Sequence, residues 1–256
     1  MMADSAVSDP HRIYAIGDIH GRLDLLEQII EIIRLDMDEL GGTGLTVTLG
    51  DYVDRGPDSR GVLERLSSNP FVTPYIALKG NHEVLFETFM ADPSTGPQWR
   101  SLGGLETLHS YSIPVAPLLV GRGYDAAAEQ LRTVLPPGHS KFLASLKLSF
   151  DAGRYFLCHA GIRPNVSFER QSPQDLLWIR EDFLNSQADF GKVVVHGHTP
   201  NEEPEVLPNR INVDTGAFAT GRLTCVVLEA ESHRFLYANQ RSNSLRDGKL
   251  SKFSES

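Results

Sequence analysis

The sequence has little cysteine, no long hydrophobic run and no excess of positive charge. Its two cysteines, Cys158 and Cys225, lie in apolar, strand-like stretches, so we expect buried core thiols and no disulfide framework. No stretch is long enough to span a membrane, and Met1 to Pro10 carries no apolar signal core. These absences predict a cytoplasmic protein that has no membrane partner.

The charge balance is acidic. Asp and Glu number 33 against 24 Lys and Arg, which gives a formal net charge of −9. Surfaces that bind nucleic acid are normally basic, so we expect no nucleic-acid partner. An acidic molecule does not attract anions from a distance either, so any bound phosphate must be held by local arginines.

The chain length of 256 residues fits one large domain with a substantial core. We place this domain at residues 12–238. The N-terminal residues 1–11 and the tail 239–256 are expected to be flexible. Nothing in the sequence indicates the oligomeric state.

Five short polar motifs follow apolar runs along the chain. They are Gly17–Gly21, Gly50–Gly56, Gly80–Glu83, His159–Gly161 and Gly197–Pro200. Each places a carboxylate, an imidazole or an amide beside a glycine, and such residues at strand ends build the sites of open α/β sheets. The mixture of oxygen and nitrogen ligands without thiolate suits Mn, Fe or Zn and disfavours a cysteine-rich structural zinc site.

The spacing of the motifs predicts repeated strand–helix–strand units. Asp51 follows Asp18 by 33 positions and Asn81 follows Asp51 by 30, which matches a βαβ unit of roughly 30 residues or more. Repeating this unit returns each motif to the same edge of a parallel sheet. We expect strands at 12–16, 45–49 and 73–78 and helices at 23–40, 59–66 and 82–90.

The segment 91–147 breaks this rhythm. Prolines and glycines punctuate two helix-like stretches at about 104–111 and 124–135, so we expect a helical insertion over the sheet. The remaining strands, expected at 146–150, 155–158, 193–195, 211–213 and 223–228, predict a second sheet packed on the first. The first two of them flank Asp151-Ala152-Gly153 as a hairpin.

In their order, the five motifs resemble those of the phosphoprotein phosphatase (PPP) family of the calcineurin-like metallophosphoesterases, from Arg12 to about Val227. The resemblance implies an α/β fold of four layers, in which two packed β-sheets are flanked by helices, here with a helical insertion. Trp178-Ile179-Arg180-Glu181 resembles the bacterial-type branch known from Rhizobiales, which includes serine/threonine and tyrosine protein phosphatases. Trp99 and Thr107 also resemble a bacterial pattern, but we interpret them as ordinary helix packing.

The resemblance implies two divalent metal ions, with Mn²⁺ as the first choice and Fe or Zn as alternatives. The implied ligands are Asp18 and His20 for one ion, Asp51 as the bridge, and Asn81, His159 and His198 for the other. One such aspartate alone could be a helix N-cap, and one histidine could be structural, but the constellation argues for a metal site. Because Pro200 replaces a histidine found in related enzymes, we expect few protein ligands on the first ion. We expect His196 on the same strand face as His198. We interpret it as a core residue, or as one that supports the metal ligands without binding the metal.

The resemblance also implies a mechanism of direct attack on the phosphate by a hydroxide that bridges the metals, without a phosphoenzyme. His82 would donate the proton to the leaving group, and Asp54 would orient its ring and raise its pKa. Arg55 would bind the phosphate oxygens. The second phosphate-binding arginine is Arg180 or Arg163, and we favour Arg180.

These features predict a phosphoric monoester hydrolase that acts on phosphoserine or phosphothreonine, or on phosphotyrosine, in a protein or peptide. One alternative is a symmetrical diadenosine tetraphosphate hydrolase, which typically departs from Asp54-Arg55-Gly56 and has aspartate in place of Glu83. The other is an inactive scaffold that binds phosphoproteins, which would not need His82. The sequence leaves the side-chain preference, the target and the native metal open.

Overall fold

The computed structural model describes residues 12–230 and 232–240. Residues 1–11 and 241–256, both of which we expected to be flexible, lie outside the described residues. The last described strand continues to Asn239, one residue into the segment that we assigned to the tail.

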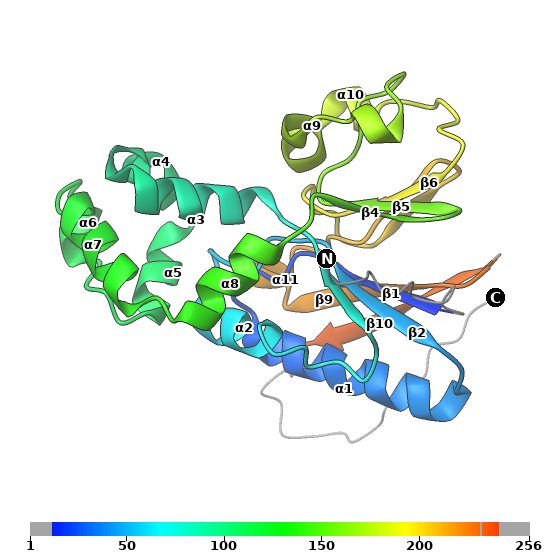
Figure 1. Cartoon of the computed structure of the whole chain (residues 1–256), viewed down its shortest axis with the longest axis horizontal. Coiled ribbons are helices and arrows are strands. Elements are labelled where there is room, and N and C mark those ends of the chain that lie inside the picture. Colours follow the sequence, from blue (N-terminus) through cyan, green and yellow to red (C-terminus); the bar gives the residue numbers. More distant parts are fainter. Residues whose placement is uncertain (1–11, 231, 241–256) are drawn as a thin grey trace, which may run out of the picture.

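Two mixed β-sheets form the centre of the molecule (Figure 1). The first has the strand order β10-β9-β1-β2-β3. Its strands are β1 (Arg12–Ile16), β2 (Gly44–Thr48), β3 (Tyr75–Ala77), β9 (Arg222–Leu228) and β10 (His233–Asn239). Strands β1, β2 and β3 run parallel, whereas β9 is antiparallel to both β1 and β10.

The second sheet has the order β4-β5-β6-β8-β7. Its strands are β4 (Ser149–Ala152), β5 (Tyr155–Cys158), β6 (Val193–His196), β7 (Glu205–Leu207) and β8 (Arg210–Asn212). The three central strands β5, β6 and β8 are parallel, and the two outer strands are antiparallel to their neighbours. Each sheet therefore has a parallel set of strands whose carboxyl ends meet at one edge.

Alternate side chains of each central strand point to opposite faces of the sheet, and this decides what each of them packs against. In β1, Tyr14 and Ile16 pack toward the helices, whereas Ile13 and Ala15 pack between the sheets. A period of two is what a strand buried on both faces requires. Cys158 and Cys225 are buried and free, which confirms the prediction of core thiols.

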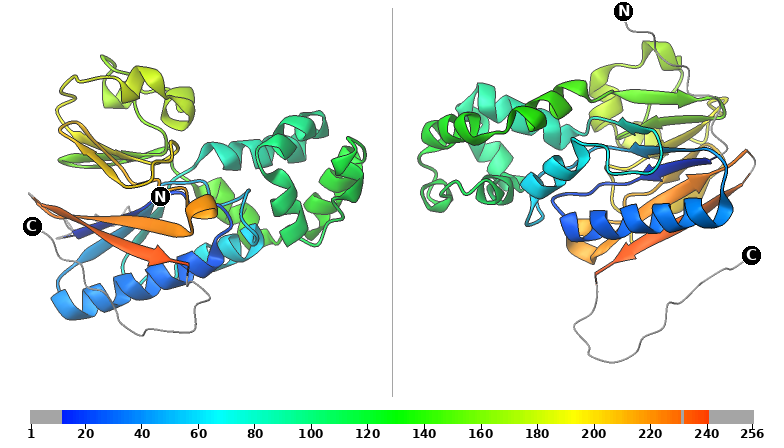
Figure 2. Two further views of the ribbon diagram at one scale, coloured as in Figure 1. Left: turned by 180° about the vertical axis from the view of Figure 1, so that it is seen from behind. Right: turned by 60° about the horizontal axis from the view of Figure 1, so that its bottom comes forward.

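Helices cover the outer faces of both sheets. Helix α1 (Leu23–Leu40) lies on the first sheet and buries apolar residues at helical spacing, with α2 (Ser59–Leu66) beside it. Helices α9 (Pro173–Trp178) and α10 (Glu181–Leu184) cover the second sheet (Figure 2). The order helix, sheet, sheet, helix confirms the predicted four-layer fold.

A group of further helices lies beyond one end of the sheets. These are α3 (Asn81–Ala91), the 3-10 turn η1 (Pro93–Thr95), α4 (Gly96–Ser101), α5 (Gly104–Ser110), α6 (Ala116–Leu119), α7 (Tyr124–Val134) and α8 (Pro137–Ser145). The helical insertion was predicted over the sheet, but Figures 1 and 2 show it extending from the sheet ends. Its apolar residues, among them Trp99 packed on Phe86 and Phe89, continue the core between the first sheet and its helices.

The structure differs from the sequence predictions mainly at short elements. The hairpin turns at Gly153-Arg154, so Asp151 and Ala152 belong to β4 and not to the turn. We did not predict the strands β7 and β10, the 3-10 turn η2 (Phe168–Arg170), or α9, α10 and α11 (Ala217–Thr220). Strands β7 and β10 are at sheet edges and partly exposed, so tertiary pairing decides them more than an apolar pattern does.

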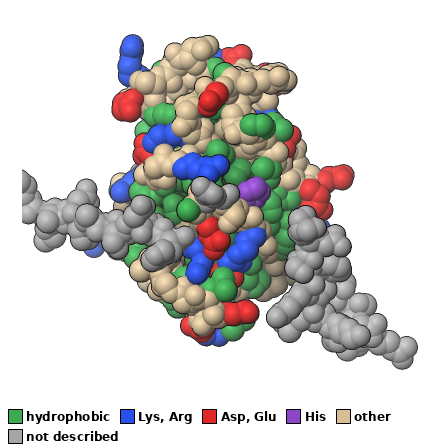
Figure 3. Space-filling view, turned by 90° about the vertical axis from the view of Figure 1, so that its right-hand side faces the viewer, with side chains coloured by type: hydrophobic (Ala, Val, Ile, Leu, Met, Phe, Trp, Pro, Cys, Tyr) green, Lys and Arg blue, Asp and Glu red, His purple; other side chains and the backbone are tan. Residues whose placement is uncertain are grey.

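The surface is mixed in charge. On the face drawn in Figure 3, acidic and basic side chains are interspersed among apolar ones. Among the described residues, none of the helices has the length and apolar character needed to cross a bilayer.

Candidate metal centre

Polar residues follow six strands where the parallel strands of the two sheets end. They are Asp18 and His20 after β1, Asp51 after β2, Asn81 after β3, His159 after β5, His198 after β6 and Asp214 after β8. Each of these side chains is at most 7% exposed. The structure therefore brings all six predicted metal-binding residues to one buried place and adds Asp214 to them.

Asp51 lies at the centre of this cluster. One carboxylate oxygen is 3.3 Å from Nε2 of His20, and the other is 3.4 Å from Nε2 of His159. Two groups of possible ligand atoms, each within 4.8 Å, contain Asp51: one with His20 and His82, the other with His159 and His198. A carboxylate common to two groups is what a bridging ligand between two ions must be.

The hydrogen bonds of the rings show that the cluster suits cations. Nδ1 of His159 donates to the carbonyl oxygen of Leu49 (3.0 Å), so Nε2 carries the lone pair in the neutral ring. This Nε2 atom lies 2.9 Å from Oδ1 of Asn81, so two acceptor atoms face each other. Nε2 of His20 and Nε2 of His198 are buried without a hydrogen-bond partner. A cation among these atoms would satisfy them all, since an unmet buried polar atom costs about 1–3 kcal/mol.

The protonation states agree with a role as metal ligands. Burial lowers the pKa of His20 to about 3 and that of His198 to about 2, and it also lowers the pKa of His159. Near pH 7 these rings are neutral, which is the form that binds a metal.

Asp214 is a residue that the sequence analysis missed. It is 4% exposed, and its Oδ1 accepts from the backbone N–H of Gly216 (2.9 Å). Burial raises the pKa of Asp214 to about 6, and burial together with the charge of Asp214 raises the pKa of Asp18. Val213-Asp214-Thr215-Gly216 repeats the apolar–acid–glycine pattern of the five motifs, so the signal was present in the sequence.

His196 does not belong to the cluster. Strand β6 ends at His196, and His198 has a positive φ of 68°, so the alternation of a strand does not reach His198. Our expectation that both rings share one strand face was therefore wrong. The ring of His196 packs on Phe183 with 5.0 Å between centroids, which places it in the core.

Several predicted site residues have strained backbones. Positive φ occurs at His20, Asp51, Asp54, Arg55 and His198. This conformation is uncommon outside glycine and is held only where surrounding contacts impose it. Here the backbone N–H groups of Ile19 and His20 both donate to the carbonyl oxygen of Asp51, at 3.1 and 2.8 Å.

Glu83 holds the backbone around Asp51. Its buried carboxylate accepts from the backbone N–H groups of Asp51 (2.9 Å), Tyr52 (2.7 Å) and Gly80 (2.9 Å). The sequence analysis used Glu83 only to separate two enzyme classes. In the structure it ties the second motif to the third and so positions Asp51.

His82 is held by a chain of hydrogen bonds. Its Nδ1 is 2.7 Å from Oδ2 of Asp54, and Asp54 also accepts from Nε1 of Trp99 (2.8 Å) and from Oγ1 of Thr107 (2.6 Å). Trp99 and Thr107 therefore do more than the helix packing that we predicted. Burial lowers the pKa of His82, but the charge of Asp51 and the hydrogen bond to Asp54 outweigh it and leave the pKa raised.

The three predicted phosphate-binding arginines have different surroundings. Arg55 donates from Nη2 to Nε2 of His82 (3.1 Å) and stacks on the ring of Phe218 at 4.7 Å. Arg180 is exposed and reaches the carbonyl oxygen of His198 at 3.4 Å.

Arg163 is bound to two carboxylates. It donates to Asp175 at 3.0 and 2.6 Å and also to Asp182. These two carboxylates occupy the guanidinium of Arg163, and our preference for Arg180 as the second phosphate-binding arginine stays a prediction.

Comparisons with known proteins agree with this geometry. The model of the calcineurin-like phosphoesterase family matches residues 11–223. Serine/threonine-protein phosphatase 2 of Salmonella typhimurium is 27% identical over 231 residues, which cover 85% of this chain and 93% of that protein. The asymmetrical bis(5'-nucleosyl)-tetraphosphatase PrpE of Anoxybacillus flavithermus is 27% identical over 232 residues, covering 82% and 88%.

Solved structures show the same fold. A putative diadenosine tetraphosphatase superimposes with a TM-score of 0.60 at 19% identity, covering 90% of this chain and 94% of that one. A protein serine/threonine phosphatase from Saccharomyces cerevisiae gives 0.55 at 13% identity, covering 94% and 83%. Protein phosphatases and tetraphosphatases occur among the similar proteins, so the comparisons leave the substrate open.

Proposed function

Because this chain belongs to the calcineurin-like phosphoesterase family, we propose that it is a metal-dependent phosphoprotein phosphatase. Its proposed substrates are phosphoserine and phosphothreonine monoesters, with phosphotyrosine as a further candidate. The observation that carries the proposal is the position of His82. Its ring is fixed by Asp54 at Nδ1, while Nε2 lies 3.1 Å from Arg55 and 3.9 Å from a carboxylate oxygen of Asp51.

The proposed metal ligands divide into two sets that share Asp51. Asp18 and His20 form one set, and Asn81, His159 and His198 form the other. When bound, the two divalent ions, with Mn²⁺ as the first choice, would neutralise the phosphate and lower the pKa of water at the centre. The buried, neutral imidazoles of His20 and His198, with their unpaired Nε2 atoms, fit divalent metal ions.

Two arginines contact different histidines at the proposed centre. Arg55 contacts His82, whereas Arg180 contacts the backbone of His198. A phosphate bound between them would receive charge-assisted hydrogen bonds on several oxygens. Once a phosphate oxygen accepts from Nη2 of Arg55, Nε2 of His82 is free to take a proton.

His82 is suited to protonate the leaving group. The alkoxide of serine or threonine is a poor leaving group, so a proton donor near neutral pH accelerates its departure by about 10²–10⁴-fold. The charge of Asp51 and the hydrogen bond to Asp54 raise the pKa of His82, which favours the protonated ring that this role requires. Its placement beside the phosphate-binding Arg55 puts this proton near the ester oxygen.

Hydrolysis of dinucleoside tetraphosphates is the second candidate function. Several relatives are named as bis(5'-nucleosyl)-tetraphosphatases, which favours this function. These relatives are the asymmetrical enzymes, whereas the alternative that we considered from the sequence was the symmetrical enzyme. Glu83, which we used against that alternative, bonds only to backbone groups in the structure. Its carboxylate is thus engaged away from a substrate, and the choice between the two substrate classes must be measured.

The experiment compares initial rates on phosphoserine, phosphothreonine and phosphotyrosine peptides and on diadenosine tetraphosphate, with Mn²⁺ or with a chelator. We expect phosphopeptide turnover that the chelator abolishes. His82→Asn should keep the metal content of the wild type and lose about 10²–10⁴ in kcat. Cleavage of the dinucleotide alone would move the function to nucleotide hydrolysis. Metal binding without turnover of any substrate would support the inactive scaffold.

A further inference from the structure

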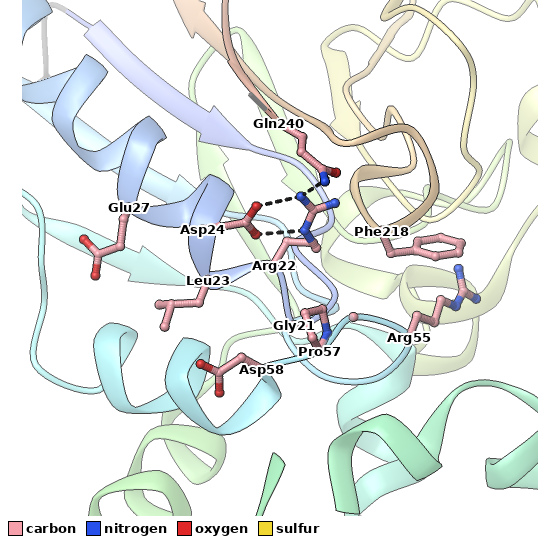
Figure 4. Close-up of a pocket in the computed structure, with 11 residues that line it drawn as sticks. Gly21, Arg22, Leu23, Asp24, Glu27, Arg55, Pro57, Asp58, Phe218 and Gln240 are labelled. Atoms are coloured by element: carbon pink, nitrogen blue, oxygen red, sulfur yellow. Dashed lines mark hydrogen bonds and ion pairs between the residues drawn. The ribbon is translucent and has the colours of Figure 1, made fainter. Parts of the chain in front are cut away.

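A pocket of about 670 Å³ opens beside the proposed phosphate site (Figure 4). The first turn of α1, the loop 55–58 and Phe218 of α11 form its walls, and Gln240 lies at its rim. Its volume is within the range of about 300–1,000 Å³ that is usual for ligand sites. None of the roles proposed above accounts for it.

Two side chains that line the pocket also contact residues of the proposed centre. Arg55 and Phe218 both line it, and the ring of Phe218 also packs on His20 with 5.4 Å between centroids. Arg55 stacks on the same ring. A substrate whose phosphate is held by Arg55 would therefore have this pocket beside it.

The walls combine apolar and acidic groups. Leu23 and Pro57 supply apolar surface, and the carboxylates of Asp24, Glu27 and Asp58 surround it. These acids are partly balanced by cations and hydrogen bonds of their own. Asp24 pairs with Arg22, Glu27 has one oxygen 2.7 Å from Arg65, and one oxygen of Asp58 accepts from the first turn of α2.

Arg22 adds little positive charge to the pocket. It is 6% exposed, and its donors are occupied by Asp24, the carbonyl oxygen of Ala217 and Gln240.

Glu27 keeps about half of its side chain exposed, and within residues 12–230 and 232–240 only one of its oxygens is in an ion pair. At the end away from Arg55, the pocket therefore offers the carboxylates of Glu27 and Asp58 beside the apolar surface of Leu23 and Pro57. Such surroundings suit an arginine or lysine, whose alkyl stem packs on apolar groups while its charged end meets a carboxylate.

We propose that this pocket binds the residues next to the phosphorylated one and selects a basic side chain there. The inference rests on the proposed phosphatase function and narrows its substrate class to phosphoproteins with arginine or lysine beside the phosphorylated residue. Electrostatics favour this occupant over a nucleotide, because a polyphosphate chain in the pocket would place its charges against Glu27 and Asp58.

The test uses phosphoserine peptides that differ only in one flanking residue, which is Arg, Ala or Glu, on either side of the phosphoserine. For the wild type we expect kcat/KM to be about 3- to 10-fold higher with Arg than with Glu on one side, since each exposed charge pair contributes about 0.2–1 kcal/mol. The variant Glu27→Gln/Asp58→Asn should reduce this ratio to below about 2-fold. Asparagine at position 58 keeps the helix cap, so the fold is retained.

A matched control is Asp38→Asn/Glu129→Gln, which makes the same change in net charge at exposed residues outside the pocket. It should keep the wild-type ratio. Turnover of p-nitrophenyl phosphate normalises the chemical step of each variant. Equal rates on Arg and Glu peptides in the wild type, or an unchanged ratio in the pocket variant, would overturn this inference alone. Absence of all phosphopeptide turnover would overturn the proposed function together with it.

Discussion

Asp54 illustrates how much of the site depends on single buried groups. It has no exposed surface and accepts hydrogen bonds from His82, Trp99 and Thr107. Each of these donors comes from a different element, so the carboxylate is fixed in one orientation. This fixes the ring of His82 in turn, because a ring with a bound Nδ1–H cannot rotate away.

Replacement of Asp54 should change the pH dependence of the enzyme. The hydrogen bond from His82 to Asp54 raises the pKa of His82, so Asp54→Asn lowers it. A proton donor is active below its pKa and loses activity as the pH rises through it. We therefore expect the alkaline limb of kcat to move to lower pH in Asp54→Asn, measured between pH 5 and 9 in Mn²⁺. Asp38→Asn, an exposed residue of α1, is the control, and a limb that does not move in Asp54→Asn would contradict the role of Asp54.

At the scale of elements, the insertion directly supports the loop that carries Arg55. The carbonyl oxygen of Gly103, between α4 and α5, accepts from the backbone N–H of Arg55 (3.1 Å). Gly103 has a φ of 103°, and a Cβ there would lie 2.7 Å from the backbone nitrogen of Arg55. Only glycine allows this close approach of two chain segments.

Gly103→Ala should therefore displace Arg55 and lower kcat/KM by at least about 10-fold, which corresponds to about 1.4 kcal/mol of lost transition-state binding. The control is Gly121→Ala in the same insertion. Gly121 also has positive φ, but a Cβ there meets nothing within 4 Å. That variant should lose about 1 kcal/mol of stability and keep its activity. Equal kinetic losses in both variants would show that backbone strain, and not contact with Arg55, is the cause.

At the scale of the whole molecule, the proposed centre joins the two sheets. Asp18, His20, Asp51 and Asn81 follow strands of the first sheet, whereas His159 and His198 follow strands of the second. Metal binding would thus connect the two halves of the fold. It would also give the unpaired Nε2 atoms of His20 and His198 a bonding partner.

Metal removal should destabilise the protein measurably. A ligand at 100 times its Kd stabilises the folded state by about 2.7 kcal/mol, and each kcal/mol shifts Tm by about 2–4 °C for a chain of this size. We expect Mn²⁺ to raise Tm by about 5–10 °C over the chelated protein in a thermal melt. Asp51→Asn should abolish most of this shift. A metal-independent Tm in the wild type would argue against the centre.

The local pattern of the amino-acid sequence, an apolar strand followed at once by a polar residue and a glycine, predicted strand–helix–strand units with polar residues gathered at one sheet edge. The four-layer fold and the six ligand residues followed from the resemblance of these motifs to a known family. The same rule would have found Asp214. It could not find the short edge strands or α10, whose apolar patterns are too brief to recognise.

Only the tertiary structure revealed what depends on contacts between distant segments. Trp99 and Thr107 reach Asp54 across about 50 positions, and the pairing of Arg163 with Asp182 distinguishes it from Arg180. The pocket beside Arg55 likewise combines parts of the chain from residue 21 to residue 240. Such contacts leave no periodic trace in the sequence, because they are created by the packing of one element on another.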